Sequence, residues 1–268
     1  MLGQLNVYGN DKVQTAIKRL QTFEPPEGYY LAFSGGKDSV VVKALADMSS
    51  VKYDAHYALT SVDPPELVHF VKSFNDVHID VPRYKDGKAI TMWNLIPRAG
   101  MPPTRIVRYC CEHLKEHGGE GRFKLTGIRK AESARRKNTR AGLELSDKRS
   151  TRRERMDPDN PSQELIHICQ TKSQRILNPI IDWTNEDVWE FIKKYEVRYC
   201  KLYDLGYKRL GCIGCPMGSK KREDLEKYPK YKEAYKRAFQ RMINARREKG
   251  LETKWETAED VMNWWIKS

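Results

Sequence analysis

Short apolar runs alternate with amphipathic segments over the first two thirds of the chain. Apolar runs of a few residues between turn residues predict buried strands, and apolar residues spaced by three or four positions predict helices. Strands alternating with helices are typical of an α/β fold, so we expect a mostly parallel sheet flanked by helices. The runs predict strands at residues 29–33, 53–59, 78–81, 123–126 and 165–169, and helices at residues 13–20, 38–48, 64–74 and 186–194, the last with Thr184 as N-cap.

The pattern changes from about Tyr199 onward. A loop with cysteines precedes a long and highly charged helical stretch, and a short helix follows it. We predict a nucleotide-binding α/β domain over residues 1–198 and a C-terminal cysteine loop with a helical region over residues 199–268. Five aromatic residues of this region lie on helix faces, which favours packing in a core over stacking on bases. They are Tyr231, Tyr235, Phe239, Trp264 and Trp265.

Composition narrows the choice of location and partner. The chain has 268 residues, of which 39% are hydrophobic, and a net charge of +13. A basic balance favours a polyanionic partner, either nucleotide phosphates or nucleic acid. No apolar run approaches the roughly 18–20 residues that span a bilayer. Residues 1–10 lack the cationic start and apolar core of a secretory signal, so we expect a cytoplasmic protein without a membrane partner.

A glycine-rich segment lies between the first predicted strand and the following helix. Two glycines let the backbone bend tightly and approach a phosphate, and the amides and dipole of the helix N-terminus attract an anion. A lysine adds a full positive charge, and two serine hydroxyls can donate further hydrogen bonds. This pattern predicts a phosphate-binding loop that is shorter than a Walker loop. Its residues are Ser34, Gly35, Gly36, Lys37, Asp38 and Ser39.

Four of the six cysteines form two pairs. Cys110 and Cys111 are adjacent, and Cys212 and Cys215 form a CxxC motif. Four thiolates from two segments can hold an iron–sulfur cluster or a structural zinc ion. Adjacent side chains diverge on a strand, so we expect the first pair at a bend or a helix start. The remaining cysteines, in the predicted strand 165–169 and in a loop, are predicted to be small core residues. They are Cys169 and Cys200.

Five motifs in order resemble those of the phosphoadenosine phosphosulfate (PAPS) reductase family. The glycine-rich segment resembles the phosphate loop of that family, which belongs to the PP-loop ATP pyrophosphatase superfamily. Arg108-Tyr-Cys-Cys111 resembles its first cysteine pair. The other three matches are Thr126-Gly-Ile-Arg129 with Glu132-Ser-Ala-Arg135, Asn178-Pro-Ile-Ile-Asp-Trp-Thr184 with Asp187-Val-Trp189, and Leu202-Tyr-Asp-Leu-Gly-Tyr207 leading to Gly211-Cys-Ile-Gly-Cys215.

The resemblance implies a fold like that of the adenine nucleotide α-hydrolases and a [4Fe–4S] cluster on the four paired cysteines. It also places Arg129 and Arg135 in the nucleotide and anion site, where a guanidinium suits phosphate or sulfate. Lys37, Asp38 and Arg129 are then the expected catalytic residues. Mg²⁺ would bridge the phosphates of ATP, and Asp38 is its candidate ligand, although the same carboxylate also suits a helix N-terminus.

The chain departs from the family at one point. Sulfonucleotide reductases of the family carry a nucleophilic cysteine near the C-terminus, whereas here no cysteine follows Cys215. This favours the ATP-dependent branch, in which an acceptor is adenylated, pyrophosphate leaves and sulfur displaces AMP. The sulfur would come from a donor protein or a small thiol, and tRNA or DNA is the candidate acceptor. Two alternatives stay open: reduction of APS or PAPS to sulfite, and a binding protein without catalysis.

A strongly basic segment lies between Arg129 and Arg155. It contains 11 Lys or Arg and 4 Asp or Glu residues, a net charge of +7. Its second half lacks apolar periodicity, which predicts a loop. Such a loop could close over a nucleotide, contact a nucleic-acid backbone or be merely solvated.

Overall fold

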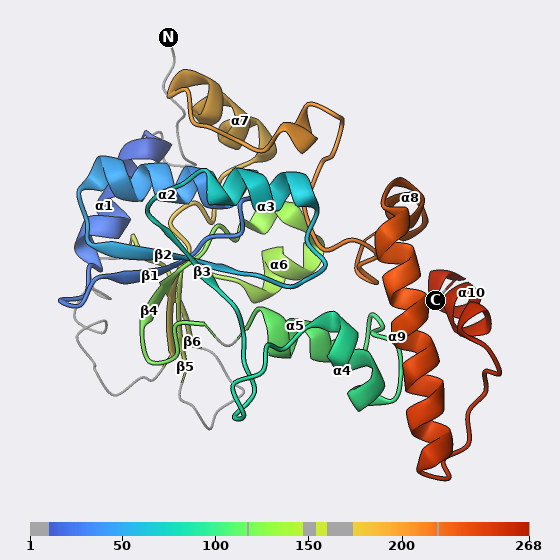
Figure 1. The fold of residues 1–268 in the computed structure, drawn as a ribbon. Coiled ribbons are helices and arrows are strands. Elements are labelled where there is room, and N and C mark those ends of the chain that lie inside the picture. The colour runs from blue at the N-terminus through green and yellow to red at the C-terminus, as the bar shows by residue number, and fades with distance from the viewer. Residues whose placement is uncertain (1–10, 117, 147–153, 160–173, 219, 268) are drawn as a thin grey trace. The chain divides into compact units, whose positions relative to one another are not determined.

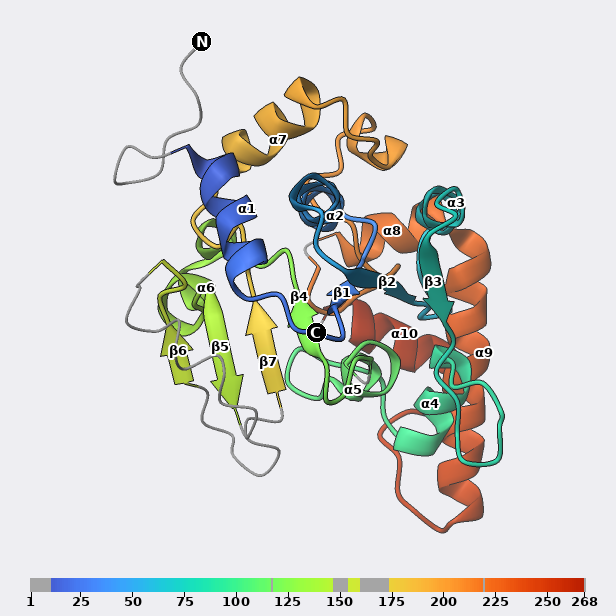
Figure 2. The same cartoon turned by 90° about the vertical axis from the view of Figure 1, so that its left-hand side faces the viewer.

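The computed structural model describes residues 11–116, 118–146, 154–159, 174–218 and 220–267. The described strands form one sheet in the order β3-β2-β1-β4-β7-β5-β6 (Figures 1 and 2). The strand predicted at residues 165–169, which includes Cys169, lies outside the described residues. The strands are β1 (Tyr29–Ala32), β2 (Tyr53–Ala58), β3 (Val77–Asp80), β4 (Phe123–Leu125), β5 (Leu143–Ser146), β6 (Glu154–Met156) and β7 (Gln174–Leu177).

The centre of the sheet is parallel and one edge is antiparallel. β1 pairs in parallel with β2 on one side and β4 on the other, and β4 pairs in parallel with β7. β5 runs antiparallel to both β6 and β7. The predicted α/β class with a mostly parallel sheet is therefore confirmed. The antiparallel pair β5 and β6 is an addition that the apolar pattern did not predict.

The chain forms two compact units. The first comprises the described residues of 1–57, 69–78 and 118–208, and the second those of 58–68, 79–117 and 209–268. The predicted division after residue 198 stays a prediction. The structure adds that two central segments group with the C-terminal residues.

Helices of the first unit pack on one another. α1 packs on α2, and α2 packs on α7 (Figure 2). The predicted cap of α7 is confirmed, because the Thr184 hydroxyl accepts a hydrogen bond from the Asp187 amide at 3.2 Å. The helices are α1 (Lys12–Thr22), α2 (Lys37–Ser49), α6 (Ala134–Thr139) and α7 (Asn185–Lys194), with short 3₁₀ turns at Lys130–Glu132 and Lys201–Tyr203. A further helix, α3 (Pro65–Lys72), follows β2.

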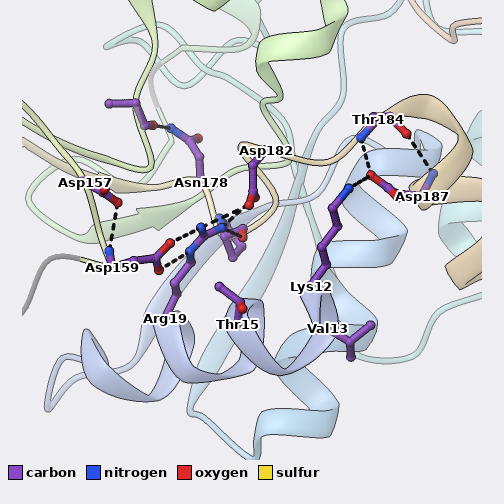
Figure 3. A network of polar contacts seen from close by, with 12 residues as sticks. Lys12, Val13, Thr15, Arg19, Asp157, Asp159, Asn178, Asp182, Thr184 and Asp187 are labelled. Atoms are coloured by element: carbon purple, nitrogen blue, oxygen red, sulfur yellow. Dashed lines mark hydrogen bonds and ion pairs between the residues drawn. The ribbon is translucent and has the colours of Figure 1, made fainter. Parts of the chain in front are cut away.

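Ion pairs of the buried Arg19 fasten α1 to Asp159, which follows β6, and to the segment that precedes α7 (Figure 3). Arg19 is only 4% exposed, and its guanidinium contacts the carboxylates of Asp159 and Asp182. It also donates to the Pro179 carbonyl at 2.7 Å. A buried guanidinium requires such partners, because an unpaired charge would be costly away from water. The motif around residues 178–184 is thus held in place from the N-terminal side of the chain.

The second unit is built around the long helix predicted near the C-terminus. α9 packs against α4, α8 and α10. Tyr235 and Phe239 on one face of α9 are buried, as the sequence predicted, and Met242 on the same face is buried with them. Trp265 is buried too, whereas Trp264 is 41% exposed. The helices are α4 (Met92–Ala99), α5 (Tyr109–Leu114), α8 (Lys221–Lys227), α9 (Pro229–Glu248) and α10 (Ala258–Lys267).

In the described part of the chain, none of the helices combines the length and apolar character needed to cross a bilayer.

Candidate functional site

The glycine-rich segment connects β1 to α2, as its position in the sequence predicted. Gly35 has a φ of +69°, in the left-handed region that favours glycine. The Ser39 hydroxyl donates to the Gly36 carbonyl at 2.9 Å and accepts from the Ser34 amide at 3.2 Å. The two serine hydroxyls lie 3.2 Å apart. The loop is therefore closed by its own serines, and it leads directly into the N-terminus of α2.

The first amides of α2 are where an anion would bind. An α-helix leaves its first N–H groups without partners inside the helix, and they carry the positive end of its dipole. The Lys37 amide donates to the Tyr203 hydroxyl at 2.8 Å. Among the hydrogen bonds of the described residues, the amides of Gly35 and Asp38 have no acceptor. These two amides are thus open to a phosphate oxygen.

Asp38, the second residue of α2, accepts from two cations. Lys37 Nζ lies 3.1 Å from one carboxylate oxygen, and Arg129 Nε lies 2.7 Å from the other. Arg129 is 1% exposed and donates further to the Trp183 carbonyl at 3.2 Å and to Asn185 Oδ1 at 2.9 Å. The arginine therefore joins the start of α2 to the start of α7.

The sheet topology brings Asp38 and Arg129 together. β1 and β4 are parallel neighbours, so their carboxyl ends lie at the same edge of the sheet. The chain order reverses between these strands, and ligands of open α/β sheets bind at such a reversal. A Cβ on Gly127 would lie 2.9 Å from the backbone of Asp38. Glycine is therefore needed there for the segment after β4 to approach the start of α2.

The four paired cysteines all belong to the second unit. Cys110 and Cys111 lie in the first turn of α5, which confirms the predicted helix start. Two hydrogen bonds hold the Cys212–Cys215 loop: the Ile213 amide donates to the Val62 carbonyl at 2.8 Å, and the Tyr235 hydroxyl donates to the Ile213 carbonyl at 3.0 Å. Gly214 in this loop has a φ of +69° and no room for a larger residue beside Trp265. Both pairs are thus set on well-packed parts of the unit.

The thiols influence one another electrostatically. A hydrogen bond from Cys110 lowers the pKa of Cys111 to about 5, with further help from Arg108 and Lys115 against the effect of burial. The pKa of Cys110 is raised by the same hydrogen bond, by burial and by the charges of Cys111, Cys212 and Cys215. Cys111 is therefore the more acidic thiol of the pair, and the charges of both cysteines of the other motif act on Cys110.

Cys212 has polar neighbours of its own. Its sulfur lies 3.7 Å from the Thr60 hydroxyl and 3.9 Å from Asp63 Oδ1. Burial raises the pKa of Cys212, while Lys115 opposes that shift. In turn, the Cys212 charge raises the pKa of Lys115. A lysine that stabilises a thiolate matches the needs of a thiolate-ligated metal group.

A four-thiolate group fits this unit in its chemistry. The donor set consists of thiols alone, on two segments of one unit, with cationic partners that favour thiolates. Within the ranges that the structure describes, no three His, Cys, Asp or Glu side chains converge closely enough to hold a metal ion as they stand. Binding of a cluster would therefore require the thiols to draw together.

Comparison with known proteins identifies the family. The family model described as the phosphoadenosine phosphosulfate reductase domain matches residues 28–218. This chain belongs to that family. The match covers the glycine-rich segment at residues 34–39, the Arg129 segment and all four paired cysteines.

Relatives add detail without assigning an activity. An uncharacterised protein of Methanocaldococcus jannaschii is 28% identical over 195 residues, covering 69% of this chain and 40% of that protein. The chain thus spans less than half the length of this curated relative. The adenosine 5'-phosphosulfate reductase of Oceanobacillus iheyensis is 51% identical over 37 residues, which are 14% of this chain and 15% of that enzyme.

Among solved structures, the phosphate complex of PAPS reductase from Candida auris is similar to this chain. It is 17% identical and superposes with a TM-score of 0.43, over 74% of this chain and 88% of that enzyme.

The basic segment of this family member is partly neutralised within the described residues. Arg136 pairs with Glu132, and Arg140 pairs with Glu144 at 2.9 Å. Arg135 is exposed in the first turn of α6. The second half of the segment, predicted as a loop, contains β5 and the first residues of β6, including Arg155, so that part of the prediction is wrong. Residues 147–153 between these strands lie outside the described residues. The anion-binding role expected for Arg135 therefore stays a prediction.

Two residues of the quoted motifs acquire contacts that the sequence did not assign. The Tyr203 hydroxyl meets the Lys37 amide, and Gly127 packs on Asp38. Both lie in segments that resemble the family, so the resemblance marked them. Their partners are distant in sequence, and spacing alone could not identify them. Cys200, predicted as a core residue, is 1% exposed, which confirms its burial.

Proposed function

We propose that this chain binds ATP through residues 34–39 and uses it to activate an acceptor for sulfur transfer. The observation that carries the proposal is the arrangement at the start of α2. Unpartnered amides of the loop, Lys37 and the Asp38–Arg129 pair meet where the order of parallel strands reverses. Such an arrangement suits the phosphates of an adenine nucleotide.

The proposed reaction balances in two displacements. An acceptor oxygen attacks the α-phosphorus of ATP, the bond to the β-phosphate breaks, and pyrophosphate leaves with its electron pair. A sulfur nucleophile then forms a bond to the activated carbon of the acceptor, and AMP leaves. Neither step needs a nucleophile from the protein. The chain contributes by positioning the phosphates and by neutralising their charge.

Lys37 and Asp38 have complementary parts in this proposal. In the structure both carboxylate oxygens of Asp38 are engaged, one by Lys37 and one by Arg129. Asp38 would hold the Mg²⁺ that accompanies ATP, this ion would neutralise phosphate charge, and Lys37 would then contact a phosphate oxygen. Arg129 keeps its other contacts to Trp183 and Asn185 and holds Asp38 in place.

Cys110, Cys111, Cys212 and Cys215 are the proposed ligands of a [4Fe–4S] cluster. The support is the all-thiol donor set on one unit and the cationic neighbours Arg108 and Lys115. A bound cluster would supply a site for holding or relaying sulfur from a donor protein or a small thiol. The protein residues around it would stabilise the thiolates and exclude water.

Iron analysis tests the cluster. Anaerobically purified protein is expected to contain about four iron atoms per chain, as one cubane cluster requires. The double variant Cys212→Ser/Cys215→Ser should lose this iron and the visible absorption. Cys200→Ser changes a buried cysteine outside the two pairs and should retain both. Wild-type protein that contains zinc and no iron would show that the cluster assignment is wrong.

A nucleotide panel tests the reaction. With ATP, Mg²⁺ and cluster-intact protein, we expect release of pyrophosphate and AMP, and no sulfite from APS or PAPS with a thiol donor. Sulfite formation without ATP turnover would instead establish sulfonucleotide reduction, which the similarity to an adenosine 5'-phosphosulfate reductase favours. Tight binding of one of these nucleotides without turnover of any would establish a binding protein.

A further inference from the structure

A short basic hairpin precedes α4 in the second unit. Arg83 and Ala89 form an antiparallel bridge, and the Tyr84 amide donates to the Lys88 carbonyl at 2.9 Å. Gly87, at the tip, has a φ of +81°. Arg83 also donates to the Gly87 carbonyl at 2.8 Å. Residues 83–89, which we call the basic hairpin, therefore form a defined turn with several cationic side chains.

Asn94 fastens the basic hairpin to α4. Its Oδ1 accepts from the Thr91 amide at 2.9 Å and from the Tyr84 hydroxyl at 3.2 Å. Its Nδ2 donates to the Ala89 carbonyl at 2.9 Å. The Arg98 guanidinium, from the last turn of α4, lies 4.9 Å from the centre of the Tyr84 ring. These contacts fix the positions of the hairpin and of α4, and so of their cationic side chains, relative to one another.

Two hollows lie along this structure, with volumes of about 270 and 630 Å³. Tyr84, Lys85 and Arg98 line both of them. Arg83 adds a cation to the smaller hollow and Lys88 adds one to the larger. Two hollows that share a cationic wall offer room for more than one anionic group.

More cationic than anionic side chains line these two hollows. Asp86 is the single carboxylate among the residues that line them, and it pairs with Lys88 at 3.3 Å. In the part of the chain that the structure describes, Arg83, Lys85 and Arg98 form no salt bridge. Because like charges repel, cations held together without carboxylates favour an anionic ligand.

We propose that the basic hairpin and Arg98 bind the phosphate backbone of a nucleic acid. A ligand with regularly spaced phosphates can occupy both hollows at once, which a single small anion cannot. Lysine and arginine supply sequence-independent affinity of this kind by releasing counterions. Binding of a nucleic acid is a property of this surface alone. A role of that nucleic acid as the acceptor in sulfur transfer rests on the proposed function.

Fluorescence anisotropy with labelled oligonucleotides tests the proposal. Single-stranded RNA, single-stranded DNA and duplex DNA would be titrated with wild-type protein, Lys85→Gln, Arg98→Gln and the double variant. We expect the double variant to bind roughly 10- to 100-fold more weakly. For a single strand, the slope of log K against log salt should fall by about 0.7 for each phosphate that the variant no longer neutralises. Comparison of the affinities for RNA and for DNA identifies which nucleic acid this surface prefers.

Lys254→Gln is the matched control, because Lys254 is an exposed lysine of the same unit outside both hollows. It should retain wild-type affinity. Lys85→Gln leaves the Tyr84–Arg98 contact intact, so it reports on charge even if Arg98→Gln disturbs the fold. Equal affinities of the double variant and the control would overturn the proposal, as would binding of inorganic phosphate without binding of any oligonucleotide. Pyrophosphate release from ATP alone, measured separately, should be unchanged in these variants.

Discussion

Lys37→Ala is expected to lower pyrophosphate release from ATP by about 10²- to 10³-fold, the range found when one charge-stabilising donor is removed from an active site. In the structure Lys37 is 7% exposed and lies against Asp38, at the N-terminus of α2. Its removal takes away a full charge from the proposed phosphate site and leaves Asp38 with Arg129 as its remaining cation. Steady-state release of pyrophosphate, with and without Mg²⁺, measures the effect.

A control variant and a double variant separate the loss of the Lys37 charge from the effect of the Asp38 carboxylate that remains. Lys193→Ala removes an exposed lysine from α7 in the same unit and should keep wild-type activity. The double variant Lys37→Ala/Asp38→Asn also removes the Asp38 carboxylate, which the single variant leaves with Arg129 alone. If nucleotide binding returns in the double variant, repulsion from Asp38 accounts for the loss in the single variant. Full activity of Lys37→Ala would contradict the proposed role of the loop.

Arg129→Ala is expected to reduce both stability and nucleotide binding. The guanidinium is 1% exposed and bonds Asp38, the Trp183 carbonyl and Asn185. Removing one partner of a buried ion pair costs about 3–5 kcal/mol, because the other charge is left uncompensated. Urea denaturation measures the change in the free energy of unfolding, and ATP titration measures the change in affinity. Arg129→Lys keeps the charge, but an ammonium group cannot reach all three acceptors as the planar guanidinium does. We therefore expect losses of stability and of ATP affinity smaller than those of Arg129→Ala.

Arg135→Ala provides the contrast. Arg135 is exposed, so its removal should change the free energy of unfolding by no more than about 0.5 kcal/mol. A loss of affinity for ATP at unchanged stability would support its role in the anion site. A stability of Arg129→Ala equal to that of Arg135→Ala would contradict the positioning of Asp38 by Arg129.

Several elements followed from the apolar pattern because their burial is regular. The strand at residues 29–33 and the helix after it bury runs of apolar side chains, and the long C-terminal helix buries one apolar face. β5 was not predicted, although all four of its residues are buried. It includes Glu144, which is 1% exposed and is compensated by Arg140 and Asn178. A buried carboxylate interrupts the apolar pattern, and its partners lie elsewhere in the chain.

Local sequence was sufficient to place the glycine-rich segment before α2 and the first cysteine pair at a helix start, because glycine conformation and helix starts are properties of neighbouring residues. The partners of the loop depended on the fold. Arg129 lies 91 positions from Asp38, and Tyr203 lies 166 positions from Lys37. These contacts exist because β4 lies next to β1 in the sheet and because α7 packs on α2. Strand order and helix packing arise from interactions across the whole chain, which the spacing of residues within a segment does not encode.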